Sequence, residues 1–167
     1  GVSVFKNISL MGALRFIFGD QLSQSISSLE GLDTSSDTVL ICECSDEMTH
    51  VKHHKKKIVF QLAAMRHFAR ELENLGINIK YIRLEDPHNT GSMPSEVERF
   101  IRGRDYDLII VTEPSEYRLL QEVQQWQKKF GVPVEIREDN RFFCSIGDFE
   151  QWVKNRKQPR MEHFYRE

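Results

Sequence analysis

The chain has 167 residues, which is enough for one domain with a hydrophobic core and too few for two domains of ordinary size. Charged residues make up 29% of the sequence and the formal net charge is -2, so no overall field favours nucleic acid or a membrane surface. Hydrophobic residues make up 40% and recur periodically, which argues against a disordered chain.

The cysteines and the first residues set further limits. Cys42, Cys44 and Cys144 are an odd number without the spacing of a zinc site. Cys42 and Cys44 stand two apart on an expected strand, so they share a face and are predicted to be small core residues. This cysteine usage indicates a reducing, cytoplasmic setting, and no apolar run is long enough to span a bilayer. Residues 1–13 are too short and too mixed for a signal peptide and are interpreted as an amino-terminal extension.

The first folded segment is the apolar run Leu14–Phe18, which predicts a buried strand and ends in Gly19-Asp20-Gln21. Leu22–Leu29 is expected to be a short helix or turn. Thr38–Cys44 predicts a second strand, and the polar loop Ser45–Lys57 leads from it into a long helix.

That long helix has the clearest pattern in the chain. Apolar residues recur at steps of three and four from Ile58 to Leu75, which predicts one stripe packed against a core, and Gly76 supplies a left-handed stop. Lys52–Lys57, with His53 and His54, crowds the helix start, where the macrodipole favours negative charge. The cluster is either a solvated turn or a site for an anionic ligand, a nucleic-acid backbone or neighbouring carboxylates.

The second half of the chain continues the alternation of strands and helices. Three further strands and three helices are expected, namely Asn78–Leu84, a helix capped by Ser95 to about Arg102, Asp107–Thr112, a helix capped by Ser115 to Phe130, Pro133–Arg137, and Ile146–Asn155. The whole pattern predicts an α/β fold: a doubly wound, five-stranded parallel Rossmann-like sheet with helices on both faces over residues 14–155.

Chemistry in such a sheet is expected beyond the carboxyl ends of the strands. The loops there carry polar side chains, namely Asp20, Gln21, Glu47, His50, His53, His54, Asp86, His88, Glu113 and Glu116. Known catalytic patterns are missing: there is no glycine-rich dinucleotide fingerprint, P-loop, H-E-x-x-H or nucleophile elbow. Glu43 and Glu47 form a carboxylate pair for acid–base work but have no nucleophile near them. We therefore expect no catalytic residue and no metal ligand in this chain.

A binding pocket fits these residues better than an active site. Asp20, Gln21 and Glu47 are candidates to bond a polar heterocycle, with Phe18, Cys44 and Ile58 as apolar walls. Each also has an ordinary structural interpretation: Asp20 as a helix cap, Glu47 as a partner of Lys55, Ile58 as core. Both interpretations stay open at this point.

Several sequence blocks resemble a known family. The blocks are FGDQLS (residues 18–23), HHKKKI (53–58), AMRHFA (64–69), TEP (112–114) and MEHFYRE (161–167). In this order they resemble the deoxyribodipyrimidine photolyase-related proteins, which include the iron–sulfur bacterial cryptochromes and photolyases. The resemblance covers about residues 14–167.

The resemblance implies a domain plan. The family has an α/β domain that carries an antenna chromophore, 6,7-dimethyl-8-ribityllumazine, then a connector, then a helical domain with FAD and an iron–sulfur cluster. Its best-known members repair (6-4) photoproducts in DNA with light. By resemblance, this chain is the first domain, not catalytic by itself, and residues 156–167 begin the connector to a missing carboxyl-terminal domain. The parent is expected to be a DNA photolyase, a carbon–carbon lyase, with DNA, the small-molecule chromophore and its own second domain as partners.

The resemblance also implies a chromophore site. Together with the pocket hypothesis it gives eight positions: Phe18, Gly19, Asp20, Gln21, Cys44, Glu47, Ile58 and Gln61. The general rule for open sheets favours the gap between strands one and four, whereas the resemblance favours strands one and two, which we follow. Two other functions stay open: a photosensory cryptochrome without repair, and a non-enzymatic nucleotide- or nucleic-acid-binding module that uses Lys52–Lys57.

Overall fold

The computed structural model describes residues 12–48 and 55–143. Outside these residues lie most of the extension 1–13, the predicted helix 146–155, the connector 156–167, Cys144, and the segment that holds Lys52 and the histidines His50, His53 and His54. In the described part, five strands form one sheet: β1 (Ala13–Phe16), β2 (Thr38–Cys42), β3 (Ile79–Ile82), β4 (Leu108–Thr112) and β5 (Val134–Arg137).

All strand pairs in the sheet are parallel, and the spatial order is β3-β2-β1-β4-β5. In the register, Leu14 of β1 lies opposite Thr38 on one side and Ile109 on the other. The predicted doubly wound parallel fold is confirmed, and every predicted strand is present. β1 begins at Ala13, one residue before the expected boundary.

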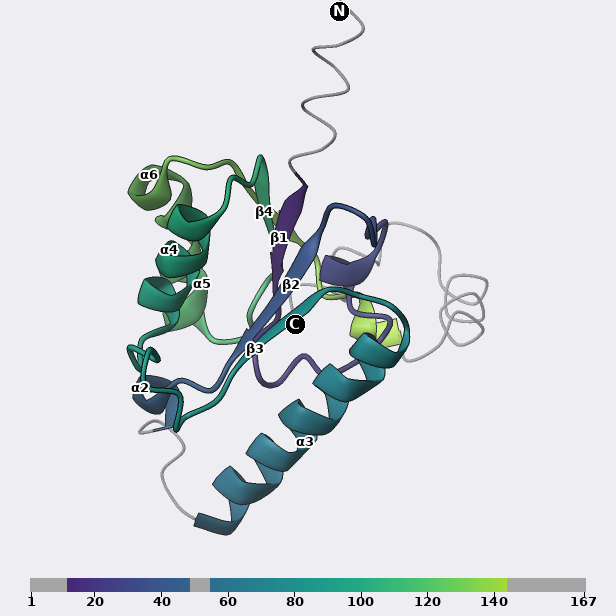
Figure 1. Cartoon of the computed structure of the whole chain (residues 1–167), viewed down its shortest axis with the longest axis vertical. Coiled ribbons are helices and arrows are strands. Elements are labelled where there is room, and N and C mark those ends of the chain that lie inside the picture. Colours follow the sequence, from purple (N-terminus) through teal and green to yellow (C-terminus); the bar gives the residue numbers. More distant parts are fainter. Residues whose placement is uncertain (1–11, 49–54, 144–167) are drawn as a thin grey trace, which may run out of the picture.

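Helices cover both faces of the sheet (Figure 1). One face carries α3 (Lys55–Asn74) and the 3-10 helix η1 (Ser27–Leu29), and the other carries α4 (Met93–Gly103), α5 (Tyr117–Gln124) and α6 (Trp126–Phe130). Because both faces are covered, the three central strands are almost entirely buried, which explains their continuous apolar runs. None of the helices in the described residues is long and apolar enough to cross a membrane.

Side chains of the central strands alternate between two core clusters. Phe16 and Leu40 face α4–α6, where Trp126 is fully buried with its ring centroid 5.7 Å from that of Phe16. Ile17 and Ile41 face α3. This alternation is the period-two pattern of extended chain, and it places Cys42 and Cys44 on one face as expected.

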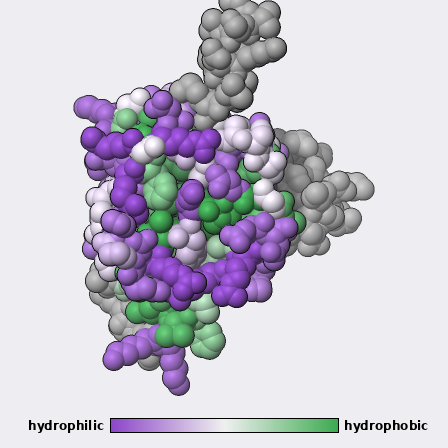
Figure 2. Space-filling model, viewed as in Figure 1, coloured by the Kyte–Doolittle hydropathy of each residue, from purple (hydrophilic) through white to green (hydrophobic). Residues whose placement is uncertain are grey.

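The long helix α3 follows its predicted stripe in its second half, where Met65, Phe68, Ala69 and Leu72 are buried. Gly76 has φ of 84°, and the N–H of Ile77 bonds the carbonyl of Leu72, so the left-handed stop is confirmed. The helix begins at Lys55, earlier than the apolar pattern indicated, and three exposed lysines occupy its first turn. Figure 2 shows hydrophobic surface next to this end of the molecule, where Val59 and Phe60 are 64% and 73% exposed.

The helix boundaries predicted from capping residues are wrong in two places. Ser95 lies inside α4, which begins at Met93 after Ser92. Ser115 caps nothing, because α5 begins after Glu116 and neither helix start has a side-chain cap bond. Other corrections concern continuity: the helix expected up to Phe130 breaks at Gln125 into α5 and α6, and the expected loop after β2 contains a one-turn helix, α2 (Ser45–Met48).

At the amino-terminal ends of the strands, the buried carboxylate of Asp37 holds several polar groups together. It accepts hydrogen bonds from the N–H groups of Ala13 (2.8 Å) and Asp33 (3.0 Å) and from Nε of Arg15 (3.0 Å). Arg15 in turn donates to the carbonyl groups of Ser28, Glu30 and Gly31. The ion pair is almost completely buried, and it fixes the segment between β1 and β2.

Candidate functional site

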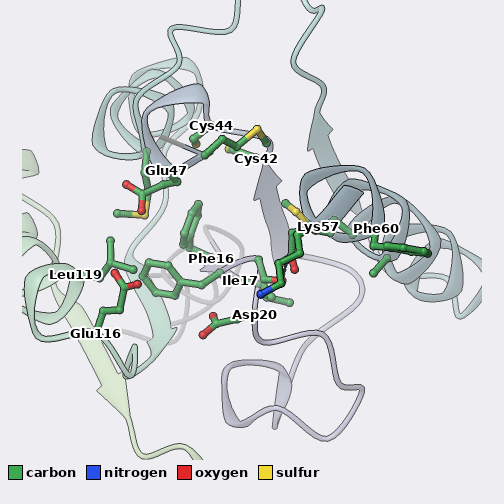
Figure 3. A pocket seen from close by; sticks show the side chains of 17 residues that line it. Phe16, Ile17, Asp20, Cys42, Cys44, Glu47, Lys57, Phe60, Glu116 and Leu119 are labelled. Carbon is green, nitrogen blue, oxygen red and sulfur yellow. Dashed lines mark hydrogen bonds between the residues drawn. The ribbon is translucent and has the colours of Figure 1, made fainter. Parts of the chain in front are cut away.

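Beyond the carboxyl ends of β1 and β2 lies a cavity of about 570 Å³ (Figure 3). Its walls are residues 16–20 at and after the end of β1, residues 42, 44, 47 and 48 at and after the end of β2, one side of α3, Met93 at the start of α4, and Glu116 and Leu119 after β4. The size falls within the range of small-molecule sites, roughly 300–1,000 Å³.

The sequence indicates two gaps for the site, between β1 and β2 and between β1 and β4, and the cavity is lined from both. Segments after β1 and β2 make most of the wall, as the family resemblance implies, and α3 flanks them. Glu116 and Leu119 add the region after β4, where the strand order reverses on either side of β1. The cavity therefore lies beside the gap between β1 and β4 as well as the gap between β1 and β2.

The inner wall of the cavity is apolar and rigid. Phe16, Phe18, Cys42 and Cys44 are buried, and the rings of Phe16 and Phe18 meet edge to face with centroids 5.0 Å apart. The aromatic contact continues from Phe16 to Trp126 behind the wall. Such a packed wall offers a flat apolar ligand a preformed surface.

The rim of the cavity is polar. It carries three carboxylates, Asp20, Glu47 and Glu116, and the amine of Lys57 (Figure 3). Arg118 bonds Glu47 at 2.8 Å and Glu116 at 3.1 Å and so connects the segments after β2 and β4. The pKa of Arg118 is raised, chiefly by its hydrogen bond to Glu47, so its guanidinium stays charged. The carboxylates supply hydrogen-bond acceptors around the opening.

Gln61 connects α3 to the turn after β1. Its side-chain amide donates a hydrogen bond to the carbonyl of Gly19, and both residues line the cavity. A Cβ at Gly19 would stand 3.0 Å from this amide and 3.2 Å from Sδ of Met65. Glycine at this position therefore lets α3 approach the turn closely.

Comparison with known proteins identifies the family. The sequence profile of the family described as deoxyribodipyrimidine photo-lyase-related protein matches residues 15–167. The chain belongs to this family. Two of the blocks that carry the resemblance contribute to the cavity: FGDQLS forms the turn after β1, and AMRHFA lies on α3.

One curated relative of this photolyase-related chain is a (6-4) photolyase from Agrobacterium fabrum (strain C58 / ATCC 33970). The two are 46% identical over 157 residues, which cover 94% of this chain and 31% of the relative. The chain thus spans about a third of the length of the curated relative that it matches.

The structure brings six of the eight predicted site residues of this photolyase-related chain to the cavity wall. These are Phe18, Gly19, Asp20, Cys44, Glu47 and Gln61. They come from three separate segments, so their meeting at one cavity is a consequence of the fold and not of sequence proximity.

Gln21 lies outside the wall and supports it. The side chain is 1% exposed, its amide donates to the carbonyl of Thr112 at 3.0 Å, and its oxygen accepts from the N–H of Phe18. It therefore ties the turn after β1 to the end of β4. Asp20 caps no helix, and its carbonyl accepts a 2.6 Å bond from Arg141.

Ile58 also lies outside the wall, because of helix geometry. The cavity side of α3 carries Lys57, Phe60, Gln61, Ala64 and Met65, which recur at steps of three and four. Ile58 is rotated by about 100° from Lys57 and is partly buried elsewhere on the helix. Lys57 lies four residues before Gln61, Ala64 lies three after it, and Phe60 lies three after Lys57, so helical spacing indicates these three residues, which the sequence interpretation missed.

Other missed wall residues have weaker signals. Phe16 and Cys42 share a face with Phe18 and Cys44, so strand alternation indicates them. Met93 and Leu119 come from α4 and α5, and only the tertiary packing brings them to the cavity. Glu116 was among the polar loop residues but was not assigned to the pocket.

The carboxylate pair Glu43 and Glu47 is separated by the fold. Glu43 is fully buried on the α3 side, where Arg66 donates two hydrogen bonds at 2.7 and 2.8 Å and Tyr81 and the N–H of Leu84 also bond it. Burial raises the pKa of Glu43, but these bonds together hold it below its ordinary value. Glu43 is thus a structural carboxylate. Among the described residues, no three His, Cys, Asp or Glu side chains come together to hold a metal ion.

Proposed function

We propose that this chain is the antenna-chromophore-binding domain of a light-dependent DNA photolyase, and that its cavity holds 6,7-dimethyl-8-ribityllumazine. The observation that carries the proposal is the cavity at the ends of β1 and β2, where six of the predicted site residues meet. The similarity to a (6-4) photolyase over 94% of this chain supports it.

The lining chemistry fits a ribityllumazine. Its flat heterocycle is matched by the apolar inner wall around Phe16, Phe18 and Cys44. Its ribityl hydroxyls and ring polar groups need hydrogen-bond partners, which Asp20, Glu47 and the other polar groups at the rim supply. Carboxylate acceptors form stronger hydrogen bonds with hydroxyls than neutral acceptors do.

An antenna requires a rigid, water-poor site and no catalytic group. When bound, the lumazine absorbs light and passes its excitation to a flavin by dipole coupling. The residues of this chain then have three tasks: to bind the ring, to orient it and to exclude water. The Phe16–Phe18–Trp126 contacts and the Gln61–Gly19 bond provide the rigidity.

The remaining parts of the proposed activity belong to the parent protein. We propose that FAD and an iron–sulfur cluster are bound by a helical domain outside this chain, and that the parent repairs (6-4) photoproducts in DNA. The lesion would be held out of the base stack for repair. The length of the relative, of which the chain spans 31%, leaves room for such a domain.

The test is a fluorescence titration of the chain with 6,7-dimethyl-8-ribityllumazine, run against FMN. We expect saturable lumazine binding that Asp20→Ala weakens by about tenfold or more, because the rim loses a charged acceptor. Glu113→Gln is the matched control, since Glu113 follows β4 at the same edge of the sheet but does not line the cavity.

The titration is repeated on the full-length parent protein if the chain alone binds nothing. Lumazine binding by neither protein, or equal loss in Asp20→Ala and Glu113→Gln, would contradict the antenna assignment. Absence of flavin absorbance from the purified parent would contradict the photolyase assignment separately.

Two alternatives are distinguished by further measurements. A photosensory cryptochrome would bind the same chromophores, and a repair assay on damaged DNA with the parent separates it from a photolyase. The exposed Lys55, Lys56 and Lys57, in the part of the cluster that the structure describes, favour a nucleotide- or nucleic-acid-binding module. Such a module would bind DNA with an affinity that falls steeply as salt rises.

A further inference from the structure

Sulfur atoms surround the cavity from several elements. Cys42 ends β2 and Cys44 follows it, whereas Met48, Met65 and Met93 come from α2, α3 and α4. Four of the five are at most 7% exposed, and Met48 is half-buried. Cys42, Cys44, Met65 and Met93 are therefore part of the cavity wall and not of the outer surface.

The Cys42 thiol in this wall is neutral. The Cys42 thiol is hydrogen bonded to Cys44, and this bond, together with burial, raises the pKa of Cys42 well above its ordinary value. Cys42 thus presents an uncharged, polarizable sulfur to a ligand. Both residues are free cysteines.

Beside the packed Phe16–Phe18 surface, Met65 and Met93 form the part of the wall that adapts to a ligand. The methionine side chain is unbranched with three rotatable bonds, and its sulfur makes favourable contacts with aromatic rings. A wall of isoleucine or valine would be stiff, because branching at Cβ restricts the first torsion. Met65 lies against the turn after β1, with its Sδ 3.2 Å from the position of a Cβ on Gly19.

We infer that the cavity accepts flat heteroaromatic rings as a class through this sulfur wall, and that it does not select by the number of fused rings. The inference rests on the proposed function and deepens it. A two-ring pteridine and a three-ring isoalloxazine with the same ribityl chain should bind with affinities within about tenfold of each other. The polar rim recognises the ribityl chain that the two compounds share.

The experiment compares 6,7-dimethyl-8-ribityllumazine with riboflavin, which carries the same ribityl chain on three fused rings. Dissociation constants of both are measured for the chain and for the double variant Met65→Ile, Met93→Ile. The stiffer wall should favour one ring system, so the ratio of the two constants should change by about fivefold or more. Leu119→Ile is the control, because it introduces the same branching at a wall position without sulfur.

Thermal unfolding of each variant checks the fold, and the single variants Met65→Leu and Met93→Leu replace the double variant if it does not fold. A wild-type ratio above about tenfold would overturn the inference while leaving the antenna proposal intact if lumazine is the tighter ligand. An unchanged ratio in the methionine variants, or an equal change in Leu119→Ile, would also overturn it. Binding of neither compound, by the chain or by the full-length parent protein, would overturn the inference and the antenna proposal together.

Discussion

The two ends of the parallel sheet differ in how far their carboxylates are buried. At the amino-terminal end, Asp37 is buried and bonded to Arg15 and to two backbone N–H groups, so the edge is closed. At the carboxyl-terminal end, Glu47 and Glu116 are more exposed and share the exposed Arg118 beside a cavity. The first arrangement stabilises the fold, and the second leaves carboxylate acceptors at the opening of a cavity. The comparison predicts that mutations at one end change stability and mutations at the other change ligand binding.

The largest effect is expected from Asp37→Ala. The change leaves Arg15 buried without its charged partner and removes acceptors from two backbone N–H groups. Breaking a buried ion pair in this way costs about 3–5 kcal/mol of unfolding free energy. Urea unfolding measures the loss, and Asp33→Ala, an exposed neighbour, should lose much less. A similar loss in both variants would show that the amino-terminal edge is not held by Asp37.

Gly12→Ala should be nearly as damaging. Gly12 has φ of +73°, and a Cβ there would stand 1.9 Å from the carbonyl oxygen of Ser36, so the backbone at this edge must move. We expect a loss of about 3 kcal/mol or more in urea unfolding. Gly103→Ala is the control, since its φ is not positive and no atom lies within 4 Å of its Cβ position. If Gly12→Ala and Gly103→Ala have the same free energy of unfolding, the close packing of Gly12 against Ser36 is contradicted.

The three central strands could be predicted from the sequence because their burial on both faces leaves continuous apolar runs. Ala13–Phe16, Thr38–Cys42 and Leu108–Thr112 are almost wholly buried. The helix starts were predicted less well. Ser95 and Ser115 are suitable capping residues, but neither position is a cap: α4 begins two residues before Ser95, at the buried Met93, and α5 begins after Glu116.

The candidate site was only partly predictable for a similar physical reason. Residues that directly follow strands, such as Asp20 and Glu47, reach the cavity because the carboxyl ends of parallel strands meet at one edge. The direction of a side chain is harder to infer. Gln21 follows Asp20 but turns to Thr112, and Ile58 follows Lys57 but lies on another side of α3. Met93 and Leu119 depend on long-range packing and have no local signal.

Glu43→Gln tests the comparison further, because Glu43 is a fully buried carboxylate although it lies at the carboxyl-terminal end of the sheet, where the cavity is. The variant should lose about 1.5–3 kcal/mol of unfolding free energy near neutral pH, as charged hydrogen bonds from Arg66 weaken. The pKa of Glu43 lies below its unfolded value of 4.5, despite burial, because of its hydrogen bonds to Arg66 and Tyr81. Its contribution is therefore present above about pH 4.5 and is lost as pH falls through the folded pKa.

Urea unfolding between about pH 7 and pH 3 measures this dependence, and the stability difference between wild type and Glu43→Gln should shrink as pH falls. Glu85→Gln is the control: Glu85 also pairs with Arg66, at 3.4 Å, but is 63% exposed. Its removal should cost less than about 1 kcal/mol. A stability difference that stays constant down to about pH 3 would argue against an ionised Glu43 in the folded protein.

The smallest stability effect, and the most informative one for function, is expected from Glu47→Gln. Glu47 forms a half-exposed ion pair with Arg118, which contributes about 0–1 kcal/mol. Glu122→Gln is a matched control, because Glu122 pairs with Lys129 at 3.3 Å with similar exposure and does not line the cavity. Both variants should unfold at nearly the wild-type urea concentration. Only Glu47→Gln should weaken lumazine binding, by about threefold to tenfold, because only it loses a charged acceptor at the rim. If the two variants bind lumazine equally well, the open end of the sheet recognises its ligand without Glu47, and Asp20 and Glu116 become the acceptors to test next.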